Sequence, residues 1–318
     1  MEVVLHIVLP VFGLMGIGYA VAWLRMLPDR TDAVLGNVVF TVGIPLLLFR
    51  AAIAADLDHG LPWLLWAGYF PPLAAIWAAG TLVMRRLFGR DARAGVVGGV
   101  AASYGNTLFI GLPLVVIAYG TEGGAAMAML LAVHLIVMMA ASTVLIERAL
   151  VADKAADDFS GSGGMLRNLV RNVLLGPVFI GIVAGVLWNL SGLDLPVPVA
   201  RTVDWIANAA AVSALFAMGM SLRRFGVRGN VLPALTIGAL KLVAMPLLVL
   251  ATTRWVFPLP PVWAKAMVIA AACPTGVNTY LIATRFRTGE ALSSNAITLS
   301  TALAIATVTI WLHVLESF

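Results

Sequence analysis

Ten runs of about 20 mostly apolar residues follow one another along this chain, and they constrain its fold more than any other feature. Helices are the expected structure, because an open sheet edge cannot be satisfied in hydrocarbon and the runs lack the alternation of barrel strands. We therefore predict an all-α integral membrane protein with ten transmembrane helices. The runs cover approximately residues 3–23, 33–50, 61–84, 94–118, 123–147, 170–190, 202–222, 231–255, 262–284 and 291–315.

The composition excludes several other classes of protein. Hydrophobic residues make up 61% of the 318 residues, and charged residues make up only 11%. A soluble domain carries about 25% charged residues. Too few polar side chains remain to cover a water-soluble surface, so we expect a lipid bilayer around the chain and no nucleic-acid partner. The formal net charge of +5 is then a property of the loops.

The distribution of Lys and Arg predicts the topology. The first cation of the chain, Arg25, follows the first apolar run. A signal peptide has its positive charge before the apolar run, so we expect a retained helix and no cleaved signal peptide. Loops after the odd-numbered runs hold fifteen Lys and Arg, and loops after the even-numbered runs hold four. Since cytoplasmic loops are enriched in these residues, we predict a multi-pass protein of the cell inner membrane with both termini on the non-cytoplasmic side.

The chain divides into two halves that resemble each other. A polar segment at 148–169, rich in Asp, Gly and Ser, is typical of a cytoplasmic linker and separates a first repeat, 1–147, from a second, 170–318. When the two halves are aligned without gaps, Asn106 aligns with Asn278 and Thr107 aligns with Thr279. Each half has five runs, so the two repeats would be inverted in the membrane, and inverted repeats are typical of secondary transporters.

The fourth and ninth runs are interrupted at equivalent places. Gly105 precedes Asn106 in one, and Pro274 and Gly276 precede Asn278 in the other, where they weaken helical hydrogen bonds. Paired interruptions are a good indicator of a transport site, although Gly and Pro can also merely kink a membrane helix.

These interruptions suggest which ligand the site binds. Freed backbone groups need polar partners, and the candidates are the side chains of Asn106, Thr107, Thr275 and Asn278. Helices that restart after each interruption would direct partly positive N-terminal ends at the middle of the membrane, which favours an anion.

Three further candidate residues, one lysine and two histidines, lie within the apolar runs. Lys241 is near the middle of the eighth run, where it either belongs to a functional site or bonds backbone carbonyls freed by an interruption. His134 and His6 could relay protons, but a lone histidine is more often a satisfied interior or interfacial residue.

Several chemistries have no support in the sequence. We find no nucleophile with a base, no Gly-rich phosphate loop followed by Lys, and no carboxylate beside either interruption. We therefore expect no enzyme activity, no catalytic residue, no metal site and no cofactor, and cation exchange is disfavoured.

Four segments resemble the auxin efflux carrier family, which includes plant PIN-formed carriers and bacterial transporters of malonate and related acids. The resemblance covers essentially the whole chain. The segments are NTLFIGLPL at 106–114, GIPLLLF at 43–49, KLVAMP at 241–246 and CPTGVNTY at 273–280.

The resemblance implies a 5+5 inverted repeat in which helices four and nine cross at the substrate site. It implies a scaffold of helices 1, 2, 6 and 7, a mobile transport domain of helices 3–5 and 8–10, elevator-like movement of organic anions, and a homodimer. The implied substrate-binding residues are Gly105, Asn106, Pro274, Thr275 and Asn278, with Lys241 in the family's basic position on helix eight.

Together these observations predict a secondary transporter of small organic carboxylate anions, malonate-like or auxin-like. A proton- or sodium-coupled symporter of another organic solute is the alternative, with a cation held by the carbonyl ends of the first half-helices. A membrane-embedded enzyme or sensor is the alternative from another class.

Overall fold

The computed structural model describes residues 4–54, 62–153, 171, 174–225, 227, 229 and 231–317. All regular secondary structure in these residues is helical, which confirms the predicted all-α class. Short π-helical turns, labelled η, continue several of the α-helices. The first half contains η1 (Val4–Val8), α1 (Leu9–Trp23), α2 (Thr31–Val38), η2 (Val39–Gly43), α3 (Ile44–Ile53), α4 (Trp63–Arg86), α5 (Ala92–Ser103), η3 (Thr107–Gly111) and α6 (Leu112–Ala152). The second half contains α8 (Pro177–Ser191), α9 (Val197–Leu222), α10 (Val231–Ala239), η6 (Leu240–Ala244), α11 (Met245–Ala251), η7 (Thr252–Val256), α12 (Pro261–Ala272), α13 (Asn278–Arg285) and α14 (Glu290–Glu316).

Seven helical segments in the described residues are long and apolar enough to cross a membrane. Ten apolar runs give seven such segments because two runs are joined in Thr107–Ala152, while α8 and α12 are short. The joined segment has 46 residues. If straight, it would be about 69 Å long, which is more than twice the hydrocarbon thickness. Gly120 interrupts it with φ 63° and ψ −149°, a conformation that glycine adopts without a steric penalty.

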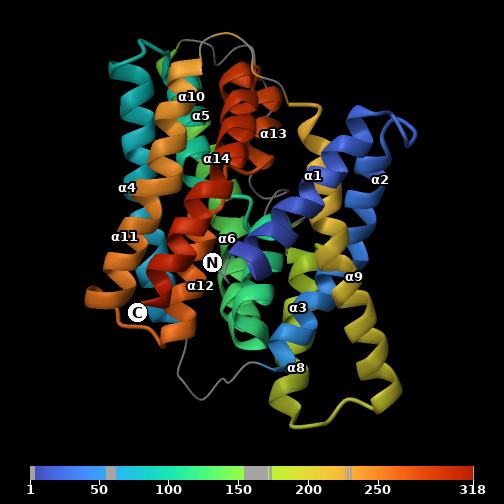
Figure 1. The fold of residues 1–318 in the computed structure, drawn as a ribbon. Helices are drawn as coiled ribbons and strands as arrows, with labels where there is room; N and C mark the ends of the chain where they lie inside the picture. The colour runs from blue at the N-terminus through green and yellow to red at the C-terminus, as the bar shows by residue number, and fades with distance from the viewer. Residues whose placement is uncertain are drawn as a thin grey trace.

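The helices pack in two groups. On one side, α1 packs on α9, and α3 packs on both α8 and α9. On the other, α4 packs on α5, α10 on α14 and α11 on α12, and α6 lies between the two groups (Figure 1). Glycines permit the closest approaches. A Cβ at Gly18 of α1 would overlap the carbonyl oxygen of Phe216 on α9.

One carboxylate joins the ends of α5 and α6. Asp153, directly after α6, accepts hydrogen bonds from the backbone N–H of Ala92 and Arg93, both at 3.0 Å, and from the Arg93 guanidinium at 3.2 Å. Burial raises the pKa of Asp153, but these bonds and the Arg93 charge outweigh it and hold the pKa below its usual value. Residues 148–152 of the segment predicted as a linker, 148–169, are the last residues of α6, and residues 154–169 lie outside the described part of the chain.

Candidate functional site

The interruptions of two helical segments meet in the interior. One, at 104–106, separates α5 from η3, and the other, at 273–277, separates α12 from α13. Asn106 donates its backbone N–H to the carbonyl of Pro274 at 2.8 Å, and Gly276 donates to the carbonyl of Tyr104 at 2.8 Å. These bonds form a short antiparallel pairing of Gly105 with Thr275, which we call the crossing.

Side chains occupy the carbonyl ends of the two helices that stop at the crossing. The Thr275 hydroxyl donates to the carbonyl of Ala101 on α5 at 2.8 Å. The Lys241 ammonium donates to the carbonyl of Ala271 on α12. Thr275 N–H also donates to the Ser300 hydroxyl on α14 at 3.0 Å. Protein groups thus satisfy backbone atoms that an interruption would otherwise leave unpaired in hydrocarbon.

A cavity of about 240 Å³ opens beside the crossing. Its walls come from both interruptions, from α6, and from Phe40 of η2 and Val178 of α8 on the other helix group. The cavity therefore lies where the two groups of helices face each other. Its lining residues are Phe40, Tyr104, Gly105, Asn106, Thr107, Leu108, Phe109, Leu131, His134, Leu135, Met139, Val178, Gly276, Val277 and Asn278.

Two helix starts border this cavity. The segment η3–α6 begins at Thr107 and α13 begins at Asn278, each preceded by an interruption. The Asn106 side chain accepts the Phe109 N–H at 3.3 Å and donates to the Met218 sulfur of α9 at 3.1 Å. Asn278 donates its side-chain amide to the Tyr104 hydroxyl at 2.8 Å. Helix N-termini carry a partial positive charge, so the cavity suits an anion.

The predicted site residues fall into two sets. Gly105, Asn106, Thr107 and Asn278 line the cavity, whereas Pro274, Thr275 and Lys241 belong to the crossing and are not among its lining residues. Lys241 is fully buried, and its ammonium lies 3.5 Å from the Met245 sulfur as well as against the Ala271 carbonyl. In this structure Lys241 contacts the crossing rather than the cavity.

Two polar residues of the cavity wall were not among the predicted site residues. Tyr104 directly precedes Gly105 in the interruption of the fourth run. That position could have indicated that Tyr104 lines the cavity. His134 was treated as one of two lone histidines, and the structure separates them: His134 is buried in the cavity wall, whereas His6 is exposed on η1. The hydrophobic pattern of the sequence did not indicate that His134 lines a cavity, because the residues around it on α6 are apolar on every face of the helix.

The chain as a whole matches a family of known proteins. The model of the family described as "Membrane transport protein" matches residues 3–312, nearly the whole chain. This chain belongs to that family. The predicted resemblance to auxin efflux carriers is thereby confirmed, and the protein is a multi-pass membrane protein of a transporter family.

Two relatives align with nearly the whole chain. A protein of Rhizobium meliloti (strain 1021) named "Putative malonate transporter" is 27% identical, over 98% of this chain and 95% of its own length. A protein of Methanothermobacter thermautotrophicus (strain Delta H) named "Uncharacterized transporter" is 26% identical, over 97% of each chain. Both relatives are named as transporters, and the family implies a small-molecule substrate.

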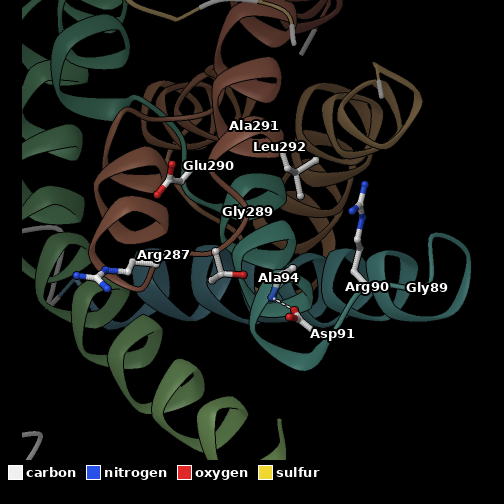
Figure 2. Close-up of a pocket in the computed structure, with 10 residues that line it drawn as sticks. Gly89, Arg90, Asp91, Ala94, Arg287, Gly289, Glu290, Ala291 and Leu292 are labelled. Atoms are coloured by element: carbon white, nitrogen blue, oxygen red, sulfur yellow. Dashed lines mark hydrogen bonds between the residues drawn. The ribbon is translucent and has the colours of Figure 1, made fainter. Parts of the chain in front are cut away.

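A second pocket of this family member lies at one end of the helices and is charged. It is formed by the segment between α4 and α5 and the segment between α13 and α14, and Figure 2 shows Arg90 and Arg287 extending at opposite ends of it. The Asp91 carboxylate accepts the Ala94 N–H at 2.7 Å. Two loops that the Lys and Arg count assigns to one side of the membrane thus lie together. The pocket contains none of the predicted site residues.

Proposed function

We propose that this protein is a secondary transporter of small organic carboxylate anions, which bind in the cavity beside the crossing. The observation that carries the proposal is the meeting of two helix starts and two asparagine amides, Asn106 and Asn278, at one interior cavity. Partly positive helix ends and amide N–H groups are the donors that a carboxylate requires, and a low-dielectric interior strengthens their effect.

The size of the cavity and the name of one relative favour a short acid. The cavity volume is about 240 Å³. Typical pockets for drug-sized ligands begin at roughly 300 Å³ and extend well above it. A relative that is 27% identical is named for malonate, a three-carbon dicarboxylate. We therefore place the substrate at the malonate-like end of the predicted range, with auxin-like acids as the second choice.

For transport we propose ten membrane passes arranged as a 5+5 inverted repeat. The scaffold would comprise η1–α3, α8 and α9, and the transport domain would comprise α4–α6 and α10–α14, moving like an elevator against it. The packing of α1 and α3 on α9, and of α4 on α5, supports two separate bodies. Phe40 and Val178 place scaffold residues in the cavity wall, where relative movement would open or close the site.

The proposal includes an inner-membrane location, non-cytoplasmic termini and a homodimer, as the Lys and Arg count and the family resemblance predict. A coupling proton or sodium ion remains the alternative mechanism. The structure offers one argument against a cation at the carbonyl end of α12, since the Lys241 ammonium already contacts the Ala271 carbonyl there. A second positive charge at that place would be repelled.

Flux into liposomes tests the proposal. Purified protein would be reconstituted, and uptake of labelled malonate measured in competition with acetate, an indole carboxylic acid and the neutral diamide of malonate, with and without sodium or a pH gradient. We expect malonate to be carried and the diamide to compete at least roughly tenfold less well, because charged hydrogen bonds are the stronger ones. No protein-dependent flux of any carboxylate would contradict the proposal.

A further inference from the structure

One buried polar atom of the cavity wall has no partner. His134 lies on α6, is 1% exposed and lines the cavity beside the crossing. Its Nε2 atom is buried and makes no hydrogen bond with any residue that the structure describes. Buried polar atoms are almost always hydrogen-bonded, because an unpaired one loses its bond to water without replacement. An unpaired nitrogen on a side chain that lines a cavity therefore points to a ligand.

The surroundings of His134 hold its ring in place without using Nε2. Three aromatic rings surround it, with centroids at 5.7 Å for Tyr69, 6.3 Å for Phe70 and 5.3 Å for Tyr104. Phe70 is stacked on the imidazole, and the two tyrosines contact it edge to face. Phenylalanine could make the same ring contacts at this position. Packing alone thus gives no reason for a histidine.

Electrostatic surroundings point in the same direction. Lys241 is the charged group that acts on His134, while Tyr69 and Tyr104 are the other titratable side chains against it in the described residues. No carboxylate among the described residues bonds to Nε2 of the imidazole. When Nε2 carries the proton, a bound ligand can supply the acceptor that the described residues do not, and a carboxylate is an acceptor-only group when ionised.

His134 lies on a different helix from the two asparagines of the crossing. Asn278 and Asn106 lie at the starts of α13 and η3, and His134 lies one pass later in the chain than Asn106, on the α6 segment after Gly120. Tyr104 links the two places, since it accepts the Asn278 amide and contacts the His134 ring. The cavity thus offers two donor positions on separate walls, which suits a ligand with two acidic groups.

We infer that His134 donates a hydrogen bond from Nε2 to the second acidic group of a short dicarboxylate, whose first carboxylate lies at the helix starts beside Asn106 and Asn278. This inference rests on the proposed function and adds a specificity-determining residue to it. His134 would make the transporter prefer a di-acid over a mono-acid of similar size.

The test compares binding of malonate and acetate to His134→Phe and His134→Gln. Phenylalanine keeps the ring contacts and removes the donor, while glutamine restores an N–H near the Nε2 position. We expect His134→Phe to weaken malonate binding by at least roughly tenfold and acetate binding much less. His134→Gln should recover a large part of the malonate affinity. His6→Phe, on the exposed His6, is the matched control and should leave both affinities unchanged.

The possible results separate this inference from the proposed function. Equal loss of both acids in His134→Phe, or no loss at all, would overturn the role of His134 while leaving the transporter proposal standing. Wild-type protein that binds neither acid would overturn this inference, and it would overturn the transporter proposal as well if no other carboxylate is carried in the liposome assay. The melting temperature of ligand-free His134→Phe, measured in detergent, shows that the variant is folded before binding is compared.

Discussion

Asn106 and Pro274 are joined by a backbone hydrogen bond of 2.8 Å, although they belong to interruptions in different halves of the chain. The bond fixes the start of η3 relative to the start of α13, so both helix ends face one cavity. Neither interruption could form this site alone, because each supplies only one helix start and one asparagine amide.

Replacing Gly18 should separate α1 from α9. A Cβ there would overlap the Phe216 carbonyl oxygen, which is backbone and cannot rotate away. We expect Gly18→Val to lower the free energy of unfolding by about 1–3 kcal/mol, read as a lower melting temperature in detergent. Gly13→Val on the same helix is the control, since a Cβ at Gly13 meets nothing within 4 Å. Equal effects of the two variants would contradict the packing described.

The Asp153 carboxylate should stabilise the junction of α5 and α6 only while it is ionised. Asp153→Asn removes the charge that holds the Ala92 and Arg93 N–H groups. We expect a loss of about 1–2 kcal/mol near neutral pH. Because the folded-state pKa is lowered, this stabilisation is complete above the ordinary aspartate pKa of 3.8 and is lost as the pH falls through the folded-state value.

Melting curves of wild type and Asp153→Asn between about pH 7 and pH 3 check this prediction. The two curves should converge at the acid end. The exposed Asp194, changed to Asn, serves as the control and should show no such difference. A gap between wild type and Asp153→Asn that stays constant with pH would show that the carboxylate charge is not the cause.

Lys241 should act mainly on the stability of the crossing. Lys241→Met removes the donor to the buried Ala271 carbonyl. Leaving that acceptor unpaired should cost about 1–3 kcal/mol. Lys265→Met, on a half-buried lysine of α12, is the matched control. Malonate and its neutral diamide should lose affinity equally in Lys241→Met. A selective loss of malonate would instead show that the ammonium acts on the bound anion.

Labelling of single cysteines tests the predicted sides of the membrane. The only cysteine, Cys273, is buried, so Cys273→Ala gives a background without a native thiol. In that background we expect Asp194→Cys to react with a membrane-impermeant maleimide in whole cells, and Arg90→Cys to react only after lysis. The reverse pattern would invert the topology and place the arginine-rich loops outside.

Hydrophobic patterning and composition predicted the helical fold, because backbone N–H and C=O groups in lipid must be hydrogen-bonded within the protein. The long apolar runs around Leu14 or Val249 can be satisfied only as helices, so this part of the prediction followed from the sequence. The interruptions were also predictable, since Gly and Pro weaken the hydrogen bonding of a helix interior, and Gly105 and Pro274 fall at equivalent places in the two halves. Gly120 lies in the short gap between the predicted runs 94–118 and 123–147, and the structure continues the helix on both sides of this residue.

Side-chain directions at the crossing could not be predicted from the sequence. Pro274 and Thr275 lie within the second interruption but do not line the cavity, because the antiparallel pairing sets which residues face it. The depth of Lys241 was predictable, but its contact with Ala271 depends on how η6 packs on α12. His134 lies many residues from either interruption, and only the packing of α6 brings it to Tyr104.

The central claim is that the anion binds between the two asparagines of the crossing, and malonate affinity of Asn106→Ala and Asn278→Ala tests it most directly. Each amide should contribute a charge-assisted hydrogen bond, so we predict a loss of roughly 10-fold to 100-fold in each variant. Asn37→Ala, on an exposed asparagine of α2, is the control and should bind like wild type. Wild-type affinity and transport rate in both crossing variants would contradict the account.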